Sequence, residues 1–156
     1  MTRAVAVRLA ALAAVVLVAA VCGQQAESPK GMPGYTDKYM MRISSDPAPP
    51  RARQRNTFKI VVRDKETGVP IDGGEGLLYG STNPKKKEGD HYIDVPVMKV
   101  WDTFVAGAEP GTYYANVNFV VATDWAMGIR FRKDSTQKLE QVDWMQTVNN
   151  ATGEAP

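Results

Sequence analysis

The sequence predicts an all-β protein, an immunoglobulin-like antiparallel β-sandwich of about seven strands. Apolar and polar residues alternate with period two along residues 111–131, and the same alternation recurs in shorter segments separated by turns rich in Gly and Pro. Apolar residues make up 44% of the chain, which is enough for one buried core. We expect the sandwich to span residues 37–148.

The central segment, residues 111–131, sets the pattern. Its odd-numbered residues are apolar over 113–121 and again over 125–131. Because successive side chains of a strand leave opposite faces, each half of the segment has one buried face. We expect the two halves to pair as an antiparallel hairpin through a tight turn at residues 122–124. A lone hairpin is marginally stable in water, so other strands must cover it.

Four other segments are expected to supply strands before this hairpin. Residues 38–45 and 57–64 alternate cleanly, residues 77–79 follow a Gly-Gly pair, and residues 97–105 are extended with a less regular pattern. Residues 81–90, which include three consecutive lysines, are expected to form a polar loop that keeps a sheet edge soluble.

Residues 139–148 fit two secondary structures. Alternating apolar positions fit a strand, whereas the spacing of Leu139, Val142 and Met145 fits one face of a helix. We favour a closing strand, because the preceding pattern is all-β. Residues 149–156 are expected to form a disordered tail.

Residues 1–22 have the features of a signal peptide. Arg3 and Arg8 precede an uncharged apolar run over residues 9–21. This run is shorter than the roughly 20 residues that a membrane-spanning helix needs, so we expect export. Residues 23–36 have no periodicity and contain Gln-Gln, Ser-Pro and Met-Pro-Gly, which predicts a flexible tether.

Cys22, the only cysteine, makes the expected location more specific. Residues 17–22 resemble a bacterial lipobox, in which the cysteine becomes the lipidated first residue of the mature protein. Val21 stands where that motif usually has Gly or Ala. We expect a lipid on Cys22 that anchors an exported chain to the membrane, in the periplasm or outside the cell. Ordinary cleavage near Gly23 or Ala26 is the alternative.

Charge and cysteine content exclude several classes of partner and site. Loss of Arg3 and Arg8 with the signal segment reduces 19 basic residues to 17, which equals the 17 acidic residues. A chain without excess positive charge is not expected to bind nucleic acid. With no cysteine after Cys22, the domain has no internal disulfide, no cysteine-ligated zinc site and no Cys-His nucleophile pair.

Turn and strand motifs run through residues 38–133. They are Ile43-Ser-Ser-Asp-Pro-Ala-Pro49, Asn56-Thr-Phe-Lys-Ile-Val-Val-Arg-Asp64, Thr67-Gly-Val-Pro-Ile71, Pro110-Gly-Thr-Tyr113 and Trp125. Together they resemble the YtkA-like and FixH-like group of extracytoplasmic domains. The resemblance implies an immunoglobulin-like sandwich that is exported or membrane-tethered, with no catalytic residues to transfer.

Some members of that group carry a segment rich in Met and His and are linked to copper handling or cytochrome oxidase assembly. The corresponding residues 95–101 keep Pro96 and Met98 but lack the second Met and the His. A Cu(I) site would have to combine Met98 with Met127 and His91, the only histidine. Met127 shares a strand face with apolar neighbours, where Met fills the core. We expect no metal or other cofactor, and a copper carrier is the alternative function.

The sequence favours protein interaction over catalysis. It has no Gly-rich phosphate loop, nucleophile elbow or H-E-x-x-H motif, so we expect no catalytic residues and no small-molecule ligand. Trp101 and Trp144 lie where alternation is broken, and one of them is a candidate interface anchor. The expected function is a non-enzymatic, membrane-tethered accessory subunit with a protein partner in or on the membrane. A membrane-bound electron-transfer complex is one setting for it.

Overall fold

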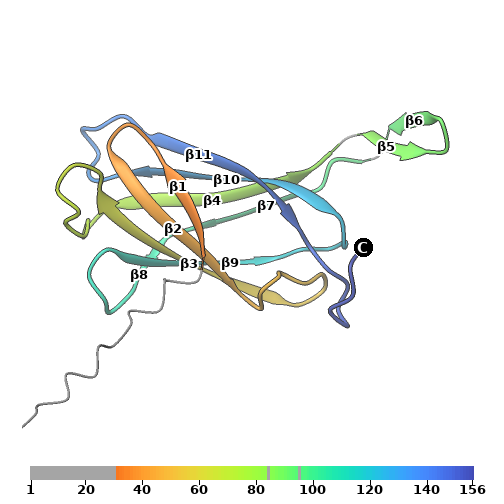
Figure 1. Cartoon of the computed structure of the whole chain (residues 1–156), viewed down its shortest axis with the longest axis horizontal. Helices are drawn as coiled ribbons and strands as arrows, with labels where there is room; N and C mark the ends of the chain where they lie inside the picture. Colours follow the sequence, from red (N-terminus) through yellow and green to blue (C-terminus); the bar gives the residue numbers. More distant parts are fainter. Residues whose placement is uncertain (1–30, 84, 95) are drawn as a thin grey trace, which may run out of the picture.

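Two antiparallel sheets face each other and form a β-sandwich (Figure 1). The computed structural model describes residues 31–156 apart from residues 84 and 95. One sheet has five strands in the order β1-β2-β3-β9-β8, and the other has four in the order β11-β10-β4-β7. A two-stranded ribbon, β5-β6, extends from one end of the sandwich. The predicted all-β sandwich is confirmed, and no helix capable of crossing a membrane occurs in the described part of the chain.

The strands follow the expected segments closely. The five-stranded sheet contains β1 (Met32–Tyr35), β2 (Tyr39–Asp46), β3 (Arg55–Asp64), β9 (Thr112–Asn118) and β8 (Val105–Ala106). The four-stranded sheet contains β11 (Glu140–Thr147), β10 (Asp124–Arg132), β4 (Glu75–Thr82) and β7 (Lys99–Thr103). The ribbon consists of β5 (Lys85–Glu88) and β6 (His91–Asp94). Residues 139–148 therefore contain a strand, as favoured. The sheets have nine strands instead of about seven because β1 and β8 are short additions at the edges.

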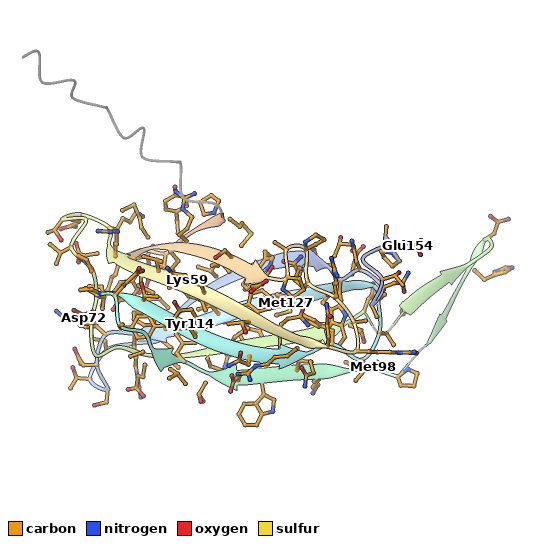
Figure 2. The ribbon with its side chains drawn as sticks, turned by 90° about the horizontal axis from the view of Figure 1, so that it is seen from below. Lys59, Asp72, Met98, Tyr114, Met127 and Glu154 are labelled. Carbon is orange, nitrogen blue, oxygen red and sulfur yellow. The ribbon has the colours of Figure 1, made fainter. Side chains whose placement is uncertain are left out.

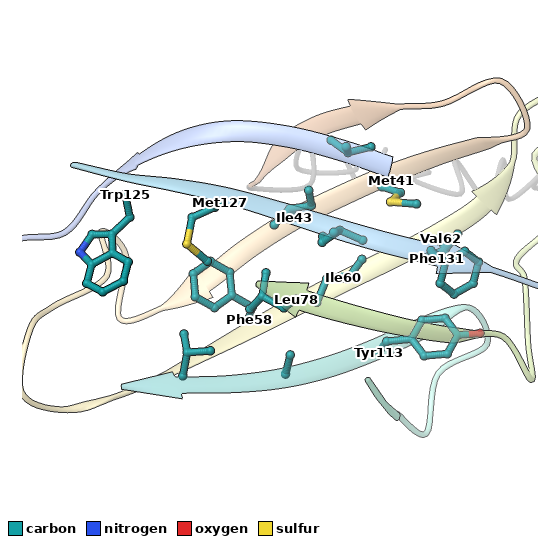
Figure 3. Packing of buried hydrophobic residues seen from close by; sticks show 14 of the residues in the cluster. Met41, Ile43, Phe58, Ile60, Val62, Leu78, Tyr113, Trp125, Met127 and Phe131 are labelled. Atoms are coloured by element: carbon teal, nitrogen blue, oxygen red, sulfur yellow. The ribbon is translucent and has the colours of Figure 1, made fainter. Parts of the chain in front are cut away.

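The core lies between the sheets, where side chains from both inner faces meet (Figures 2 and 3). Alternate residues of β9 and β10 are buried, which confirms the faces predicted for residues 113–119 and 125–131. The largest fully buried side chains are Trp125, Tyr113, Phe58, Phe119, Phe131, Ile60, Leu78, Met127, Ile129, Val62, Val148 and Asn56. Burial of this apolar surface supplies the main driving force for folding.

The predicted hairpin is wrong, because β9 and β10 belong to different sheets. β9 pairs with β3 and β8, and β10 pairs with β4 and β11. The chain between them is an arch that crosses from one sheet to the other, a spacing of about 10 Å. Inside the arch, the rings of Phe119 and Trp125 meet edge to face at 5.0 Å, and Trp125 Nε1 donates to Val121 O at 3.3 Å. Alternation in the sequence identifies which face of each strand is buried. It does not distinguish a hairpin within one sheet from an arch between two sheets, because the same residues are buried in both.

The strand β7 continues into β8 and changes sheet at Phe104. Phe104 points into the core, with its ring centroid 5.7 Å from that of Tyr113 and 6.2 Å from that of Phe131. Asp102, two residues before the crossing, also joins the sheets. Its Oδ2 accepts a 2.6 Å hydrogen bond from Asn116 N of β9. This edge of the sandwich is therefore closed by the chain itself.

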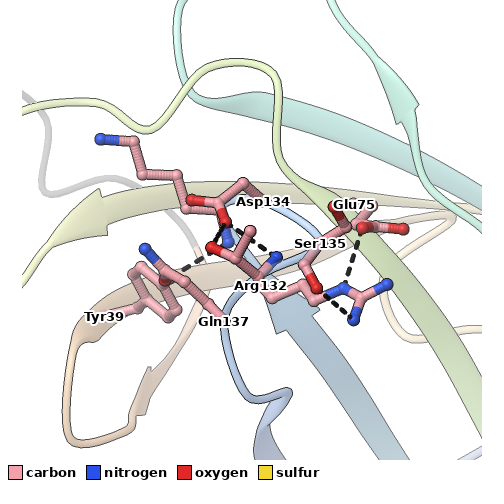
Figure 4. Close-up of polar contacts among 8 residues, drawn as sticks. Tyr39, Glu75, Arg132, Asp134, Ser135 and Gln137 are labelled. Atoms are coloured by element: carbon pink, nitrogen blue, oxygen red, sulfur yellow. Dashed lines mark hydrogen bonds and ion pairs between the residues drawn. The ribbon is translucent and has the colours of Figure 1, made fainter.

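Polar contacts connect the beginning of β2, the beginning of β4 and the end of β10 (Figure 4). Tyr39 of β2 donates from its hydroxyl to Gln137 Oε1 at 2.8 Å and accepts from Lys133 N at 3.1 Å. Arg132 Nε of β10 donates to Glu75 Oε1 of β4 at 2.8 Å. The connection from β10 to β11 is thereby held against both sheets.

Three boundaries expected from the sequence are wrong. The tether predicted over residues 23–36 contains β1, which pairs with β2. The tail predicted to be disordered is hydrogen-bonded: Asn149 N donates to Pro50 O at 2.9 Å, and Asn150 N donates to Glu154 O at 2.7 Å. The loop expected at residues 81–90 contains β5, the first strand of the ribbon. These segments are too short for a hydrophobic period to show in the sequence, although Met32 and Gly34 of β1 do face the core.

Asn56 is buried and organises the connection between β2 and β3. Its side chain is 0% exposed. Oδ1 accepts from Arg51 N at 2.7 Å, and Nδ2 donates to Arg51 O at 2.8 Å and to Gln54 O at 2.9 Å. One amide therefore satisfies three backbone groups of a connection that otherwise makes backbone hydrogen bonds only with Asn149 and Phe119 among the described residues.

We predict that Asn56→Ala lowers the free energy of unfolding by about 3 kcal/mol, because partly buried backbone groups lose their hydrogen bonds. Denaturant unfolding followed by tryptophan fluorescence measures the change. Asn118→Ala is the matched control: Asn118 is exposed on the neighbouring strand β9, and its loss should change stability by less than about 0.5 kcal/mol. Equal losses in the two variants would contradict this role.

Candidate interaction surface

The outer face of the four-stranded sheet presents a row of residues in register across all four strands. Trp101 of β7 lies opposite Tyr79 of β4, Tyr79 lies opposite Gly128 of β10, and Gly128 lies opposite Asp143 of β11. Trp101 is 70% exposed, the highest value among the large apolar side chains described. We call this row, together with Arg130 and Gln141, the Trp101 face.

Gly128 allows Tyr79 to lie across the sheet. A Cβ atom at position 128 would stand 2.3 Å from Cζ of Tyr79, so any side chain there would displace the ring. In this position the Tyr79 hydroxyl donates to Asp143 Oδ1 at 2.7 Å. Covering a strand glycine with a neighbouring aromatic ring is a stabilising arrangement in itself. Here it also fixes the orientation of the ring.

A closed set of contacts holds the polar side chains around Tyr79. The Arg130 guanidinium lies 5.3 Å from the centroid of the Tyr79 ring, a cation-π distance. Arg130 Nε donates to Gln141 Oε1 at 3.3 Å, and Gln141 Nε2 donates to Asp143 Oδ2 at 2.5 Å. Asp143 then accepts from Tyr79 and completes the set. Side chains that are already ordered lose less entropy when a partner binds.

The composition of the Trp101 face is that of a binding hot spot. Trp, Tyr and Arg are the residues enriched where alanine substitution costs most binding energy. Within the described residues, Arg130 uses only Nε in hydrogen bonds, so its other donors are available to a ligand. Met145, on the same face of β11, is 65% exposed and adds apolar area. The face can dock an apolar and hydrogen-bonding surface, and it contains no nucleophile paired with a base.

The expected candidate sites are dispersed. His91 is exposed at the outer end of the ribbon, beside its turn. Met127 is 1% exposed within the core, and Met98 packs against that core, so the three residues weighed for copper do not converge. No group of three or more His, Cys, Asp or Glu side chains comes together in the part of the chain that the structure describes. Cys22 and the signal segment lie outside the described residues.

Of the two tryptophan candidates, Trp101 is exposed and Trp144 is half-buried against the core. The sequence therefore located one residue of the Trp101 face. It missed Tyr79, Arg130 and Asp143, because Tyr79 contacts residues that are 51 and 64 positions away in the chain. Gly128 within an otherwise regular strand was the available signal, since a strand glycine often marks a close approach.

Comparison with known proteins gives one similar protein. No family model matches the chain, and no solved structure matches it. The chain is 31% identical over 115 residues to the tumor necrosis factor receptor superfamily member 1A of Rattus norvegicus. The alignment covers 69% of this chain and 23% of that protein, so the chain spans about a quarter of the length of this relative.

We predict that the pKa of Tyr79 falls when Gly128 is replaced by Ala. Burial and the hydrogen bond to Asp143 raise this pKa to about 12. The added Cβ displaces the ring, breaks the hydrogen bond and returns the pKa towards about 10. Absorbance titration of phenolate, compared with Tyr79→Phe to isolate this residue among six tyrosines, measures the shift.

Asp143→Asn should lower the same pKa, because it removes the negative charge beside the hydroxyl. Ala126→Ser is the control, since Ala126 is exposed on the same strand face and makes no contact with this network. A Tyr79 pKa that stays near 12 in the Gly128 and Asp143 variants would show that the hydroxyl is not held as described.

Proposed function

We propose that this chain is an exported, non-enzymatic binding module whose Trp101 face docks on a protein partner. The observation that carries the proposal is the fixed network of Tyr79, Asp143, Gln141 and Arg130 beside an exposed tryptophan. Such an exposed, pre-ordered aromatic and arginine surface is costly to maintain in water unless a partner covers it.

The proposed location is the membrane surface, through a lipid on Cys22. Residues 23–30 separate that cysteine from the described domain, and eight residues span at most about 28 Å. A module held so close to the bilayer meets partners in or on the membrane. The resemblance to YtkA-like and FixH-like domains supports an accessory subunit of a membrane-bound complex, with electron transfer as the activity of that complex. Similarity to a receptor supports an exported binding role.

We predict that Trp101→Ala abolishes partner capture without unfolding the domain. The side chain is 70% exposed, so its loss should change stability little, whereas a hot-spot tryptophan contributes at least about 2 kcal/mol to binding, or some thirtyfold in affinity. Affinity purification from solubilised native membranes, quantified against wild type, measures the effect. Val69→Ala, which removes an apolar side chain that is 57% exposed in a turn, is the control. Partners retained equally by both variants would contradict the proposed surface.

The lipid anchor has its own test. We predict that the mature protein begins at Cys22 with a mass increased by acyl chains, and that Cys22→Ser moves the chain to the soluble fraction. Mass spectrometry of the intact mature protein measures the first, and fractionation measures the second. An unmodified N-terminus at or after Gly23 would rule out the anchor and leave a soluble exported module.

A further inference from the structure

A groove of about 570 Å³ crosses the outer face of the five-stranded sheet, on the side of the molecule opposite the Trp101 face. Its floor includes Met40 of β2 and Val61 of β3. Pro33 and Tyr35 of β1 line one side, and Pro110 lines the other. The volume lies within the range of small ligand sites, about 300–1,000 Å³. Pro33 and Pro110 in the two walls have restricted backbones.

Two arginines stand diagonally across the two inner strands of this groove. Arg42 lies opposite Val61, and Arg63 lies opposite Met40, so the two are diagonal neighbours, about 7–8 Å apart with their Cβ atoms somewhat closer. Each guanidinium is tied back to a backbone carbonyl: NH1 of Arg42 donates to Gly31 O at 3.3 Å, and NH1 of Arg63 donates to Gly68 O at 3.0 Å. Their remaining donors make no hydrogen bond to any described residue.

The charge of the groove is positive. Lys59 of β3 also lines it and forms a 2.9 Å ion pair with Glu109 (Lys59 is labelled in Figure 2). Glu109 is the one acidic residue among the described residues that line the groove, so Arg42 and Arg63 remain uncompensated. Two oriented guanidinium groups over an apolar floor select a ligand with two carboxylates and an apolar portion.

We propose that this groove binds an extended acidic peptide segment of a protein, with two carboxylate residues separated by one residue. In an extended chain, side chains two residues apart leave the same face and are separated by about 6.6–6.8 Å. This spacing matches the diagonal between Arg42 and Arg63. Apolar residues two positions before and after this pair leave the same face of the peptide and contact Met40, Val61 and Tyr35, whose ring is 62% exposed.

An extended peptide fits better than a lipid surface. Both arginines come from β2 and β3, between the wall formed by β1 and the wall formed by Pro110. Both side chains line the groove, and each has a hydrogen bond to a backbone carbonyl, Gly31 O for Arg42 and Gly68 O for Arg63, that restrains it. A flat layer of headgroups would meet the walls before it reached both arginines.

The test uses the full mature chain with Cys22→Ser and a fluorescein-labelled peptide of sequence Leu-Pro-Glu-Leu-Glu-Pro-Leu, whose terminal Leu residues leave the same face as the two Glu residues. Fluorescence anisotropy should show saturable binding that weakens with salt, and replacement of both Glu by Gln in the peptide should abolish it. Arg42→Gln and Arg63→Gln should each weaken binding about tenfold. Arg55→Gln is the matched control, because Arg55 is exposed on the same face of β3 beyond the groove. Thermal unfolding verifies that each variant is folded.

Several results would overturn the proposal. They are no binding at millimolar peptide, equal binding of the Gln peptide, or an equal effect of Arg55→Gln and the two groove variants. Vesicles of phosphatidylglycerol provide the last comparison. If they bind the chain through Arg42 and Arg63 while the peptide does not, the groove recognises lipid headgroups and the peptide assignment is wrong.

Discussion

The packing of two apolar sheet faces against each other is the constraint on which the other features depend. Aromatic rings hold the faces together along the whole sandwich. Phe119 meets Trp125 at 5.0 Å where the arch crosses, and Phe131 meets Tyr39 at 5.1 Å and Tyr113 at 5.4 Å elsewhere in the core. Because a strand cannot slip by one residue without reversing every side chain, this packing also fixes which residues face outwards.

The packing of the core therefore determines which residues face outwards, but those residues take no part in the packing between the sheets. On one sheet they order Tyr79 and Arg130 beside an exposed tryptophan, and on the other they place Arg42 and Arg63 above an apolar floor. The two surfaces lie on opposite sides of one rigid body and differ in chemistry, one aromatic and one cationic. With both proposed surfaces, the module would bind two partners at once without a change of conformation.

The sequence predicted the buried faces well because alternation has a local cause. It did not predict the neighbours of each strand, since β9 and β10 show the same period whether they pair or separate into two sheets. The contact between Tyr79 and Asp143 was beyond reach for the same reason, because register between distant strands is decided by the whole core. β1 and the two strands of the ribbon are four residues long each, too short for an alternating pattern to identify them as strands.

The place of β1 has a mechanical consequence. It is the first strand after residues 23–30, it lies at the edge of its sheet, and it pairs only with β2. Tension arriving from the N-terminal side would reach the open end of this pair, at Met32, and peel its backbone hydrogen bonds one after another. Pro33 and Tyr35 would leave with it, and the core would lose only the contact of the partly buried Met32. Pulling on the chain would thus dismantle one wall of the cationic groove at a load far below that needed to unfold the domain.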